Sequence, residues 1–550
     1  MIRENIKTLA ELYRYSSETY YNKPFTRWSD TSEGGYTYSS FGNTCEDLSG
    51  LLSEYGIGAG SKVAIFSQSM PNWSVAFFTA VAFGRIAIPI LPDSSENEVT
   101  NIIRHSGSEV LFVSQRLSDK INEELMEKMT LIIDIDTLRV IKKGNKGAYG
   151  EISIPSADDI ATIIYTSGTT GNAKGVMLSH GNLSSNVITS WHTCKRFSSD
   201  RWLSLLPMAH TLEMTLCMLY PMFCGASIFY LQKAPVPAVL LKAMQTVRPT
   251  TILSVPLIIE KIYRGSVLPT IKKSPVLRWL DKNANFLMCR IIGYKLKKTF
   301  GGKLTFFGIG GAKLDSEVER FLKKSGFPYA IGYGLTETSP LAGFSFGKDN
   351  LIGSFGRPVH NVKIKLIDVN PETGEGEIAI KGPNVMMGYY KDPERTKNVF
   401  TEDGWFKTND LAILDKSGNF VIKGRKSNMI LGASGENIYP EEIESVINNL
   451  DGVTESIVIE RHGRLVALVQ PIEGFIDWDK ELEDKVLDKV RAWKERLLKV
   501  VNGNVNKTSQ VSSIEIMKVP FEKTATMKIR RFLYKENAPT LEQDLFRKSA

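Results

Sequence analysis

Ten residues from Thr166 to Gly175, TSGTTGNAKG, combine hydroxyl groups, glycines and a single lysine directly after an apolar run that ends at Tyr165. Glycine-rich turns expose backbone N–H groups, hydroxyls add further donors, and a lysine adds positive charge. This combination suits phosphate oxygens, although a plain surface loop can have the same composition. The common phosphate-loop pattern G-x-x-x-x-G-K-[ST] is absent, because Lys174 is followed by Gly175.

A second pattern with chemical meaning is GFSFG at residues 343–347, which matches the G-x-S-x-G nucleophile elbow of α/β-hydrolases around Ser345. That elbow needs a strand before the serine and a helix after it. The sequence that follows, KDNLIGSFGRP, has no helical periodicity. We therefore do not expect hydrolase chemistry at Ser345.

Strands and helices must position these residues, and short apolar strands alternate with helical patterns from about residue 61 to residue 332. Examples are SKVAIFSQ with PNWSVAFFTAVAF, IAIPIL with SENEVTNIIRHSG, and LTFFGIGG with SEVERFLKKSG. This alternation predicts an α/β fold with largely parallel, doubly wound sheets. Ligands bind at the carboxyl ends of the strands in such sheets, which is where residues 166–174 would lie.

The pattern changes after residue 351, where VKIKLIDV, EGEIAIKG and NFVIKGR predict a small antiparallel subdomain. Beyond Arg425 we expect a helix with Pro440 at its first position, then a hairpin and a further helix. The chain is also too long for a single hydrophobic core. We therefore predict a large α/β domain over residues 1–424 and a small mobile α+β domain over residues 425–550.

Bulk properties exclude several classes of protein. The formal net charge of +8 over 550 residues is mild and does not predict a nucleic-acid partner. Five widely spaced cysteines indicate neither a disulfide framework nor a zinc site. No apolar stretch reaches the roughly 18–20 residues that span a bilayer. We expect a soluble cytoplasmic protein, and these features do not predict its oligomeric state.

Taken as a whole, the string YTSGTTGNAKGVMLSHGN closely resembles the phosphate-binding signature of the adenylate-forming superfamily, which includes acyl-CoA synthetases, luciferases and nonribosomal peptide adenylation domains. Further resemblances follow in order along nearly the whole chain: LPMAHTLEM, GIGGAKL, GYGLTET, GWFKTNDLA, IKGRKSNMILGASGENIYPEEIE and PFEKTATMKIRR. Among these enzymes, LPMAHTLEM and VPLIIEKIYR look most like long-chain fatty acyl-CoA synthetases.

The resemblance implies a site for ATP and Mg²⁺. Tyr333 would stack on adenine, Thr336 would donate to a phosphate oxygen, and Glu337 would hold Mg²⁺, a hard cation that prefers carboxylate oxygen. Thr166 is a second candidate ligand for the metal. The remaining contacts to ATP or AMP in the N-terminal domain would be Ser167, Gly168, Thr169, Thr170, Gly171, Lys174, Gly311, Ala312 and Gly334.

Three residues beyond position 400 would complete that site. Asp410 resembles the carboxylate that takes both ribose hydroxyls, and Arg425 resembles its cationic counterpart. Lys528 would reach the α-phosphate and the substrate carboxylate, where a positioned cation stabilises the charge that develops during attack. Without the resemblance, Lys528 would belong to a solvated basic tail. The expected catalytic residues are thus Lys528, Thr336 and Glu337.

The resemblance also implies where the acyl group and the thiol bind. The expected acyl contacts are His210, Glu213, Gly310 and Gly332, with His210 at the mouth of the acyl pocket. Taken alone, a histidine in an apolar run is more often structural. The expected contacts to coenzyme A, reached after the small domain rotates, are Gly432, Ser434 and Gly435.

Three departures from the family pattern accompany these matches. Asn409 stands where a glycine usually precedes the ribose-binding aspartate, and Ser427 and Asn428 replace the usual charged hinge residues. Met527 replaces the glycine before Lys528, which would cost about 1 kcal/mol if that position needs a positive φ. None of the three departures removes a charged residue that is expected to contact a ligand. We therefore expect them to affect the turnover rate and the motion of the hinge.

The expected reaction has two steps, with ATP and coenzyme A as co-substrates. A fatty acid attacks ATP to give an acyl-adenylate and pyrophosphate, and coenzyme A then displaces AMP. Alternatives are an acyl carrier protein as the acceptor, another carboxylic acid, luciferase-like oxidation, or a catalytically lapsed adenylate-binding protein. An amino-acid substrate is disfavoured, because no aspartate occurs between Trp202 and Gln245 to hold its ammonium group.

Basic residues between Lys272 and Lys298 interleave with large apolar residues such as Trp279 and Phe286. One interpretation is a set of ordinary helices whose long cationic side chains form a solvated face. The other is peripheral docking on anionic lipid at the inner face of the membrane. The sequence leaves both open.

Overall fold

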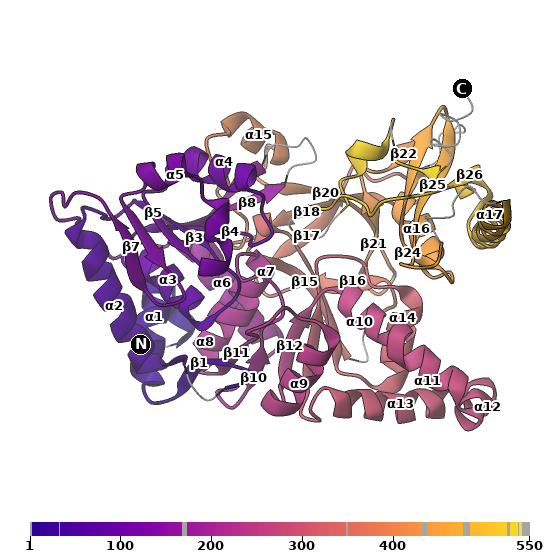
Figure 1. Cartoon of the computed structure of the whole chain (residues 1–550), viewed down its shortest axis with the longest axis horizontal. Helices are drawn as coiled ribbons and strands as arrows, with labels where there is room; N and C mark the ends of the chain where they lie inside the picture. Colours follow the sequence, from indigo (N-terminus) through magenta and orange to yellow (C-terminus); the bar gives the residue numbers. More distant parts are fainter. Residues whose placement is uncertain are drawn as a thin grey trace. The chain divides into compact units, whose positions relative to one another are not determined.

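The computed structural model describes residues 3–31, 34–167, 173–347, 350–431, 437–476, 484–524, 529–536 and 538–541. The chain folds into two compact units, which Figure 1 colours along the sequence. Unit 1 consists of Met1–Lys365, Ala379–Lys407 and Asp415–Val421. Unit 2 consists of Leu366–Ile378, Thr408–Leu414 and Ile422–Ala550. Two short segments that precede residue 425 thus belong to the C-terminal unit.

An eight-stranded sheet forms the first half of unit 1, in the order β19-β9-β8-β4-β3-β5-β6-β7. Its central strands β4, β3, β5 and β6 are parallel, as the strand–helix alternation predicts. The strands are β3 (Lys62–Phe66), β4 (Ile86–Ile90), β5 (Val110–Val113), β6 (Leu131–Asp134), β7 (Arg139–Lys143), β8 (Ile160–Ser167), β9 (Ala173–Ser179) and β19 (Gly388–Tyr389).

Helices cover both faces of this sheet. Apolar side chains of α4 and α5 pack on one face, and α3 contacts β3 and β4 from the other (Figure 1). Ser95 starts α4 with a capping box, and Gly107 ends it in a left-handed conformation. The helices in this half are α1 (Leu9–Thr19), α2 (Tyr38–Glu54), α3 (Pro71–Val81), α4 (Glu96–Ser106), α5 (Glu123–Lys128) and α6 (His180–Thr193).

The second sheet has thirteen strands, and the part of it that lies wholly in unit 1 runs in the order β16-β15-β14-β13-β12-β10-β11-β1-β2. The run from β14 to β1 is parallel, whereas β15 and β16 are antiparallel additions. The strands are β1 (Pro24–Trp28), β2 (Tyr36–Thr37), β10 (Arg201–Leu203), β11 (Ser227–Tyr230), β12 (Thr251–Ser254), β13 (Phe306–Ile309), β14 (Tyr329–Gly334), β15 (Leu341–Phe346) and β16 (Ser354–Pro358).

Helices that supply many of the apolar side chains burying one face of this sheet include α9 (Pro237–Val247), α10 (Pro256–Ile262), α13 (Asn285–Thr299) and α14 (Ser316–Ser325). Other helices of unit 1 are α7 (Thr211–Glu213), α8 (Tyr220–Cys224), α11 (Leu268–Lys273), α12 (Pro275–Asn283) and α15 (Pro393–Val399). Together the two sheets confirm the predicted α/β class with doubly wound sheets.

The division between the units falls within four strands: β17 (Lys363–Ile367), β18 (Gly376–Lys381), β20 (Phe406–Leu414) and β21 (Phe420–Arg425). The core of unit 2 is a three-stranded sheet packed against two helices. Its elements are α16 (Pro440–Asn448), β24 (Val453–Arg461), β25 (Arg464–Pro471), α17 (Asp484–Asn504) and β26 (Ser513–Ile516), with the short strands β22 (Ile430–Leu431) and β23 (Asn437–Ile438) before them. Pro440 occupies the first turn of α16, as predicted.

The serine of the GFSFG pattern lies in a paired β-strand. Ser345 lies inside β15, which pairs antiparallel with β14, and its hydroxyl donates to Asn350. That setting is not a strand-to-helix elbow, so the structure agrees with the exclusion of hydrolase chemistry. None of the helices in the described residues is long and apolar enough to cross a membrane.

Candidate active site

The predicted phosphate-binding residues sit on a β-hairpin. Strands β8 and β9 are antiparallel, and Thr166 lies directly opposite Lys174. Both residues were expected in a loop, but cross-strand pairing extends β8 as far as Ser167. Gly175 is required for packing, because a Cβ there would lie 2.8 Å from a methyl group of Ile163. The predicted residues of the hairpin tip, Gly168, Thr169, Thr170 and Gly171, and the side chain of Ser167, lie outside the described residues.

Lys174, Glu337 and Tyr389 form one hydrogen-bonded cluster. The ammonium of Lys174 lies 2.8 Å from Oε1 of Glu337 and donates to the Tyr389 hydroxyl, also at 2.8 Å. That hydroxyl in turn donates to the same carboxylate oxygen at 2.9 Å. The ammonium also lies 4.5 Å from the centroid of the tyrosine ring. Three groups from distant parts of the sequence thus converge beside the hairpin.

Burial and charge act in opposite directions on Glu337, which is only 6% exposed. Burial raises the pKa of its carboxyl group, but the charge of Lys174 and hydrogen bonds from Lys174 and Tyr389 outweigh it. The pKa therefore lies below its ordinary value, whereas burial raises the pKa of Tyr389. Glu337 is consequently a buried carboxylate that stays ionised at neutral pH.

This arrangement suits Mg²⁺ bound together with a phosphate. Mg²⁺ in nucleotide sites takes one or two protein oxygens and completes its shell with phosphate and water. Glu337 offers an ionised carboxylate, and Thr166 has a buried hydroxyl oxygen with no hydrogen-bond partner. Among the described residues there is no cluster of three or more His, Cys, Asp or Glu side chains that could hold a metal by itself. The Glu337 carboxylate and the Thr166 hydroxyl therefore fit a metal ion that is bound by the phosphates of a nucleotide as well as by the protein.

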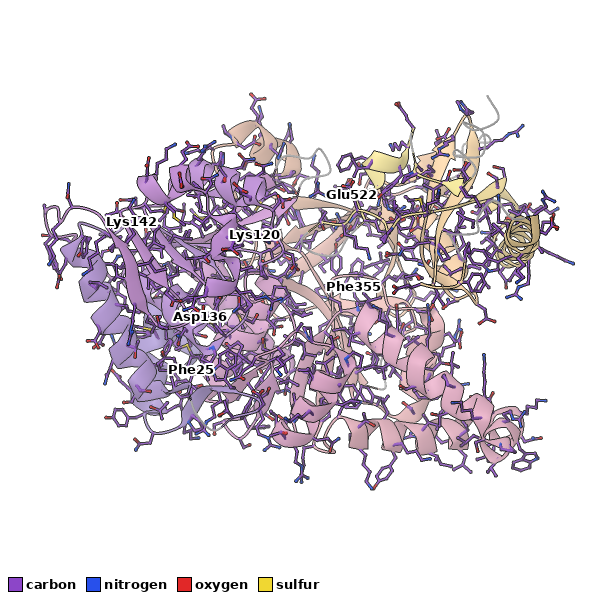
Figure 2. All side chains as sticks on the ribbon, viewed as in Figure 1. Phe25, Lys120, Asp136, Lys142, Phe355 and Glu522 are labelled. Carbon is purple, nitrogen blue, oxygen red and sulfur yellow. The ribbon has the colours of Figure 1, made fainter. Side chains whose placement is uncertain are left out.

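Tyr333 and Gly334 end strand β14 on the carboxyl side. The ring of Tyr333 is 7% exposed and stacks on Phe355 of β16, with ring centroids 4.3 Å apart (Figure 2 labels Phe355). Gly334 is required by the turn, because a Cβ there would lie 1.7 Å from the carbonyl oxygen of Pro340. Thr336 follows as the first residue of a short 3-10 helix, Thr336–Thr338, and is half-buried.

Gly310 and Gly332 lie at the carboxyl ends of the adjacent parallel strands β13 and β14. A Cβ on Gly310 would lie 3.5 Å from the carbonyl oxygen of Gly332 and 3.7 Å from the side chain of Leu212. The neighbouring Gly311 has φ of +84° and is exposed, as is Ala312. These residues therefore line the edge of the sheet where a ligand is expected.

His210 precedes the short helix α7, and Glu213 is its last residue. His210 caps the helix, since its Nδ1 accepts a hydrogen bond from the backbone N–H of Leu212 at 3.3 Å. Glu213 is fully buried and accepts hydrogen bonds from the Ser204 hydroxyl at 2.6 Å and the Leu205 N–H at 3.2 Å. Burial raises the pKa of its carboxyl group to about 7. In the structure Glu213 thus anchors α7 to the segment that follows β10.

Asp410 and Arg425 belong to unit 2, where Arg425 Nε lies 3.1 Å from Oδ1 of Asp410. The carboxylate is buried and the guanidinium is partly exposed. Asn409 has φ of +64°, which explains why an asparagine can stand where the family usually has glycine, since both tolerate this conformation. A hydrogen bond from the Asn409 N–H to Glu377 at 2.9 Å holds the turn.

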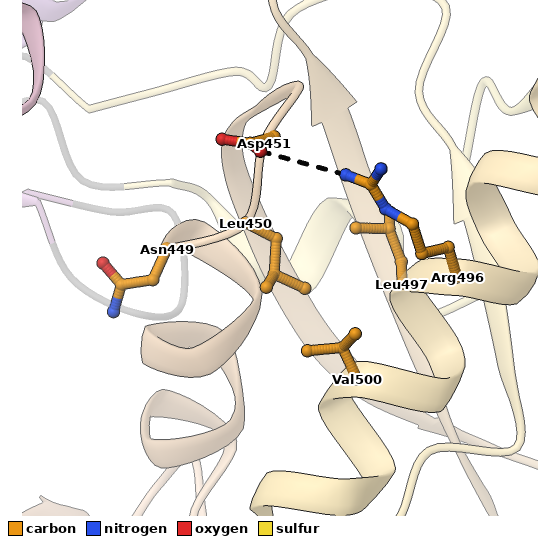
Figure 3. A pocket seen from close by; sticks show the side chains of 6 residues that line it. All are labelled: Asn449, Leu450, Asp451, Arg496, Leu497 and Val500. Carbon is orange, nitrogen blue, oxygen red and sulfur yellow. Dashed lines mark ion pairs between the residues drawn. The ribbon is translucent and has the colours of Figure 1, made fainter. Parts of the chain in front are cut away.

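Several predicted residues of unit 2 lie outside the described residues: Gly432, Ser434, Gly435, Met527 and Lys528. Their predicted roles stay predictions. Asn428, one of the unusual hinge residues, donates to Glu441 at 2.7 Å. A pocket also occurs in this unit (Figure 3), two of its lining residues form an ion pair, and none of the predicted site residues lines it. Its lining consists of Asn449, Leu450, Asp451, Arg496, Leu497 and Val500.

Tyr389 is one of two residues of the candidate site that the sequence did not predict. The signal in the sequence is slight, a Gly-Tyr-Tyr run at residues 388–390. Strand β19 places it by pairing with β9, so that Tyr389 lies opposite Val176, two residues from Lys174. The other is Phe355, which covers one face of the Tyr333 ring.

Comparisons with known proteins agree with this fold. A family model described as AMP-binding enzyme matches residues 14–390. "Long chain acyl-CoA synthetase 7, peroxisomal" of Arabidopsis thaliana is 30% identical over 532 residues, which cover 86% of this chain and 75% of that protein. "Long chain acyl-CoA synthetase 6, peroxisomal" of the same plant is 32% identical over 466 residues, covering 76% of this chain and 66% of its own length.

Solved structures share the fold. ATP-bound MatB from Rhodopseudomonas palustris is 23% identical, has a TM-score of 0.76, and the match covers 96% of this chain and 98% of that one. MenE, an o-succinylbenzoate CoA synthetase from Bacillus subtilis solved with an acyl-adenylate intermediate, is 22% identical with the same TM-score and coverage. Because the family model matches residues 14–390, more than half of the chain, the chain belongs to the AMP-binding enzyme family.

Proposed function

We propose that this protein is a fatty acid–CoA ligase that forms AMP, and that its acid is a long-chain fatty acid. The observation that carries the proposal is the buried, ionised Glu337, which is bonded to Lys174 of the β8–β9 hairpin and to Tyr389. The family match and the names of the two plant relatives support the same reaction.

In the first step, a carboxylate oxygen of the acid bonds to the α-phosphorus of ATP, and the bond from that phosphorus to the pyrophosphate oxygen breaks. Lys174 and the hairpin tip would hold the leaving pyrophosphate, and Thr336 would donate to a phosphate oxygen. Mg²⁺ bound by Glu337, with Thr166 as second ligand, would neutralise charge on the phosphates. Tyr333, with Phe355 behind it, would hold adenine beside Gly311, Ala312 and Gly334.

Unit 2 would supply the remaining groups. Asp410, fixed by Arg425, would accept hydrogen bonds from the ribose hydroxyls, and Lys528 would stabilise charge at the α-phosphate. In the second step the thiol of coenzyme A loses its proton to solvent, its sulfur bonds to the acyl carbonyl carbon, and AMP leaves with the electrons of the broken C–O bond. We propose that residues 425–550 rotate between the steps and bring Gly432, Ser434 and Gly435 to the thiol path.

The acid and the place of action are also part of the proposal. His210, Gly310 and Gly332 would face the acyl group, with Glu213 fixing α7 beneath them. The names of the relatives favour a long-chain acid. We propose that the enzyme is cytoplasmic. Because a long acyl chain partitions into lipid, we also propose that the enzyme works at the inner face of the membrane.

The test is acid-dependent release of pyrophosphate from Mg·ATP over a panel of saturated fatty acids. The proposal expects release to rise with chain length and to reach its maximum with long chains. Release driven best by short, aromatic or dicarboxylic acids would overturn the choice of substrate. A protein that binds ATP but releases no pyrophosphate with any acid would overturn the reaction.

A further inference from the structure

The helical segment Leu268–Thr299 of unit 1 consists of α11, α12 and α13. In Figure 1, α12 lies at the outer edge of the unit, and α11 and α13 lead to it and away from it. One side of the segment belongs to the core of the second sheet. The residues on that side are Ile271, Leu277, Met288, Cys289, Ile292 and Leu296.

The other side exposes large apolar residues. Trp279 is 61% exposed and Phe286 is 60% exposed. Trp279 follows Val276 by three residues on α12, so both occupy one face, and Leu277 faces the core instead. We call the exposed set the α12–α13 surface: Val276, Trp279, Phe286, Leu287 and Tyr294. Exposed clusters of tryptophan and phenylalanine are uncommon on soluble proteins and mark interaction sites.

Positive charge is concentrated on the same segment. It contains eight Lys or Arg residues and one acidic residue, Asp281, although the whole chain has a net charge of only +8. The cations alternate with the exposed rings: Arg290 lies 4.9 Å from the centroid of Phe286, and Lys298 lies 5.6 Å from that of Tyr294. Nearly all of the net charge of the chain is therefore found on one helical projection.

We propose that the α12–α13 surface docks unit 1 onto an anionic lipid bilayer. Aromatic side chains favour the boundary between headgroups and acyl chains, and lysines and arginines favour anionic headgroups. A helix that presents both binds in the plane of the interface without crossing it. A second copy of the chain is disfavoured as the occupant, because it would bring a surface of the same positive charge.

Docking goes beyond the proposed reaction and does not rest on it. It would place the enzyme where long-chain fatty acids are dissolved, so that substrate reaches it from lipid. Because lipid binding needs neither ATP nor acid, it can be measured separately from catalysis. A failure to bind lipid would remove the proposed place of action but leave the proposed reaction in place, and a failure of the reaction would leave docking in place.

The experiment is co-sedimentation of the full-length protein with vesicles, either of phosphatidylcholine alone or of equal parts of phosphatidylcholine and phosphatidylglycerol. The variants are Trp279→Ala with Phe286→Ala, and Arg278→Gln with Lys282→Gln. The matched control is Tyr149→Ala with Ile154→Ala, which removes two equally exposed apolar side chains from outside the segment. Unchanged thermal unfolding midpoints check that each variant folds.

We expect binding to the anionic vesicles only, with release as added salt screens the charges. Each of the two α12–α13 variants should weaken partitioning by about tenfold, because each removes part of the buried apolar area or of the charge. The control should bind like the wild type. Binding that both variants leave unchanged would overturn the proposal. So would a lack of binding to anionic vesicles, or an oligomer of the wild type that dissociates when Trp279 and Phe286 are removed.

Discussion

A single buried carboxylate organises the candidate site at the scale of residues. Glu337 is held by one ammonium and one phenol, and these neighbours keep it charged in a place where an unpaired carboxylate would take up a proton. Lys174 and Tyr389 reach it from strands β9 and β19, which pair with each other. The hydroxyl of Tyr389 therefore connects Glu337, the candidate metal ligand, to Lys174, the candidate phosphate-binding residue.

Replacing Tyr389 by phenylalanine removes that hydroxyl and keeps the ring. Glu337 and Lys174 each lose a hydrogen bond, and bonds to charged groups contribute about 1.5–3 kcal/mol. We expect acid-dependent pyrophosphate release to fall about tenfold or more. Steady-state rates at saturating and limiting ATP measure the change.

Tyr390→Phe is the matched control, because that hydroxyl only reaches the carbonyl oxygen of Ser106 at 3.5 Å. It should behave like the wild type. Equal activity of the Tyr389 variant and this control would show that the Tyr389 hydroxyl has no role in the site.

Asn409 leads to a second prediction at the residue scale. Because its φ is +64°, Asn409→Gly should leave stability within about 1 kcal/mol of the wild type. Asn409→Val should lower stability by about 1–2 kcal/mol and raise the KM for ATP, since the strained turn would displace Asp410. Urea unfolding and ATP titrations measure both effects, and a valine variant as stable as the wild type would contradict the argument.

Within each unit, some contacts among the candidate site residues could be predicted from sequence, and the contacts that could not be predicted have physical reasons. Motif order pointed to Asp410 with Arg425 and to Glu337, and the structure places Arg425 in contact with Asp410. The role of Tyr389 could not be predicted, because it depends on pairing between strands that are far apart in the sequence. The exclusion of Glu213 from solvent depends on tertiary packing in the same way.

At the scale of elements, α1 and α6 are joined by a neutral histidine. His180, in the first turn of α6, accepts a hydrogen bond at Nδ1 from the N–H of Leu9, in the first turn of α1. That N–H has no partner within its own helix. Burial lowers the pKa of His180 from 6.5 to about 4. The contact therefore requires the unprotonated ring.

This pKa predicts a pH dependence of stability. Between about pH 6.5 and pH 4 the unfolded chain binds a proton at His180 and the folded chain does not, so stability falls as the pH falls. The contribution lost between about pH 7 and pH 5 is about 2 kcal/mol. Urea unfolding of the wild type and of His180→Gln at both pH values measures it. The glutamine variant should lose less stability on acidification, and equal losses would contradict the assignment.

Element types could be predicted more readily than their ends. Alternating strand and helix patterns predicted β3, α3, β4, α4 and β5, because each buries a continuous apolar face. The hairpin β8–β9 was expected as a strand followed by a loop. Hydroxyl and glycine residues are typical of loops, but cross-strand hydrogen bonds extend both strands into that stretch.

At the scale of the whole molecule, we propose that different parts of unit 2 serve the two half-reactions. We expect Lys528→Ala to abolish ATP-dependent adenylation, because no other cation is proposed at the α-phosphate. Thioester formation from synthetic acyl-adenylate and coenzyme A should stay largely intact. Parallel assays of the two half-reactions test this prediction, and equal loss of both would refute the assignment of Lys528.

The division of the chain into two units was only partly accessible from sequence. A change of pattern near residue 425 predicted a separate C-terminal part, whereas segments Leu366–Ile378 and Thr408–Leu414 join unit 2 from earlier in the chain. Strands β17, β18, β20 and β21 each run from one unit into the other, so their sequence patterns show no break.

The most direct test of the account is the product balance of one reaction. The full-length protein is incubated with Mg·ATP, coenzyme A and a long-chain fatty acid, and all nucleotide, phosphate and thioester products are quantified. We expect equal amounts of AMP, pyrophosphate and acyl-CoA, and no turnover without the acid. ADP with inorganic phosphate, or AMP formed without a matching amount of thioester, would contradict it.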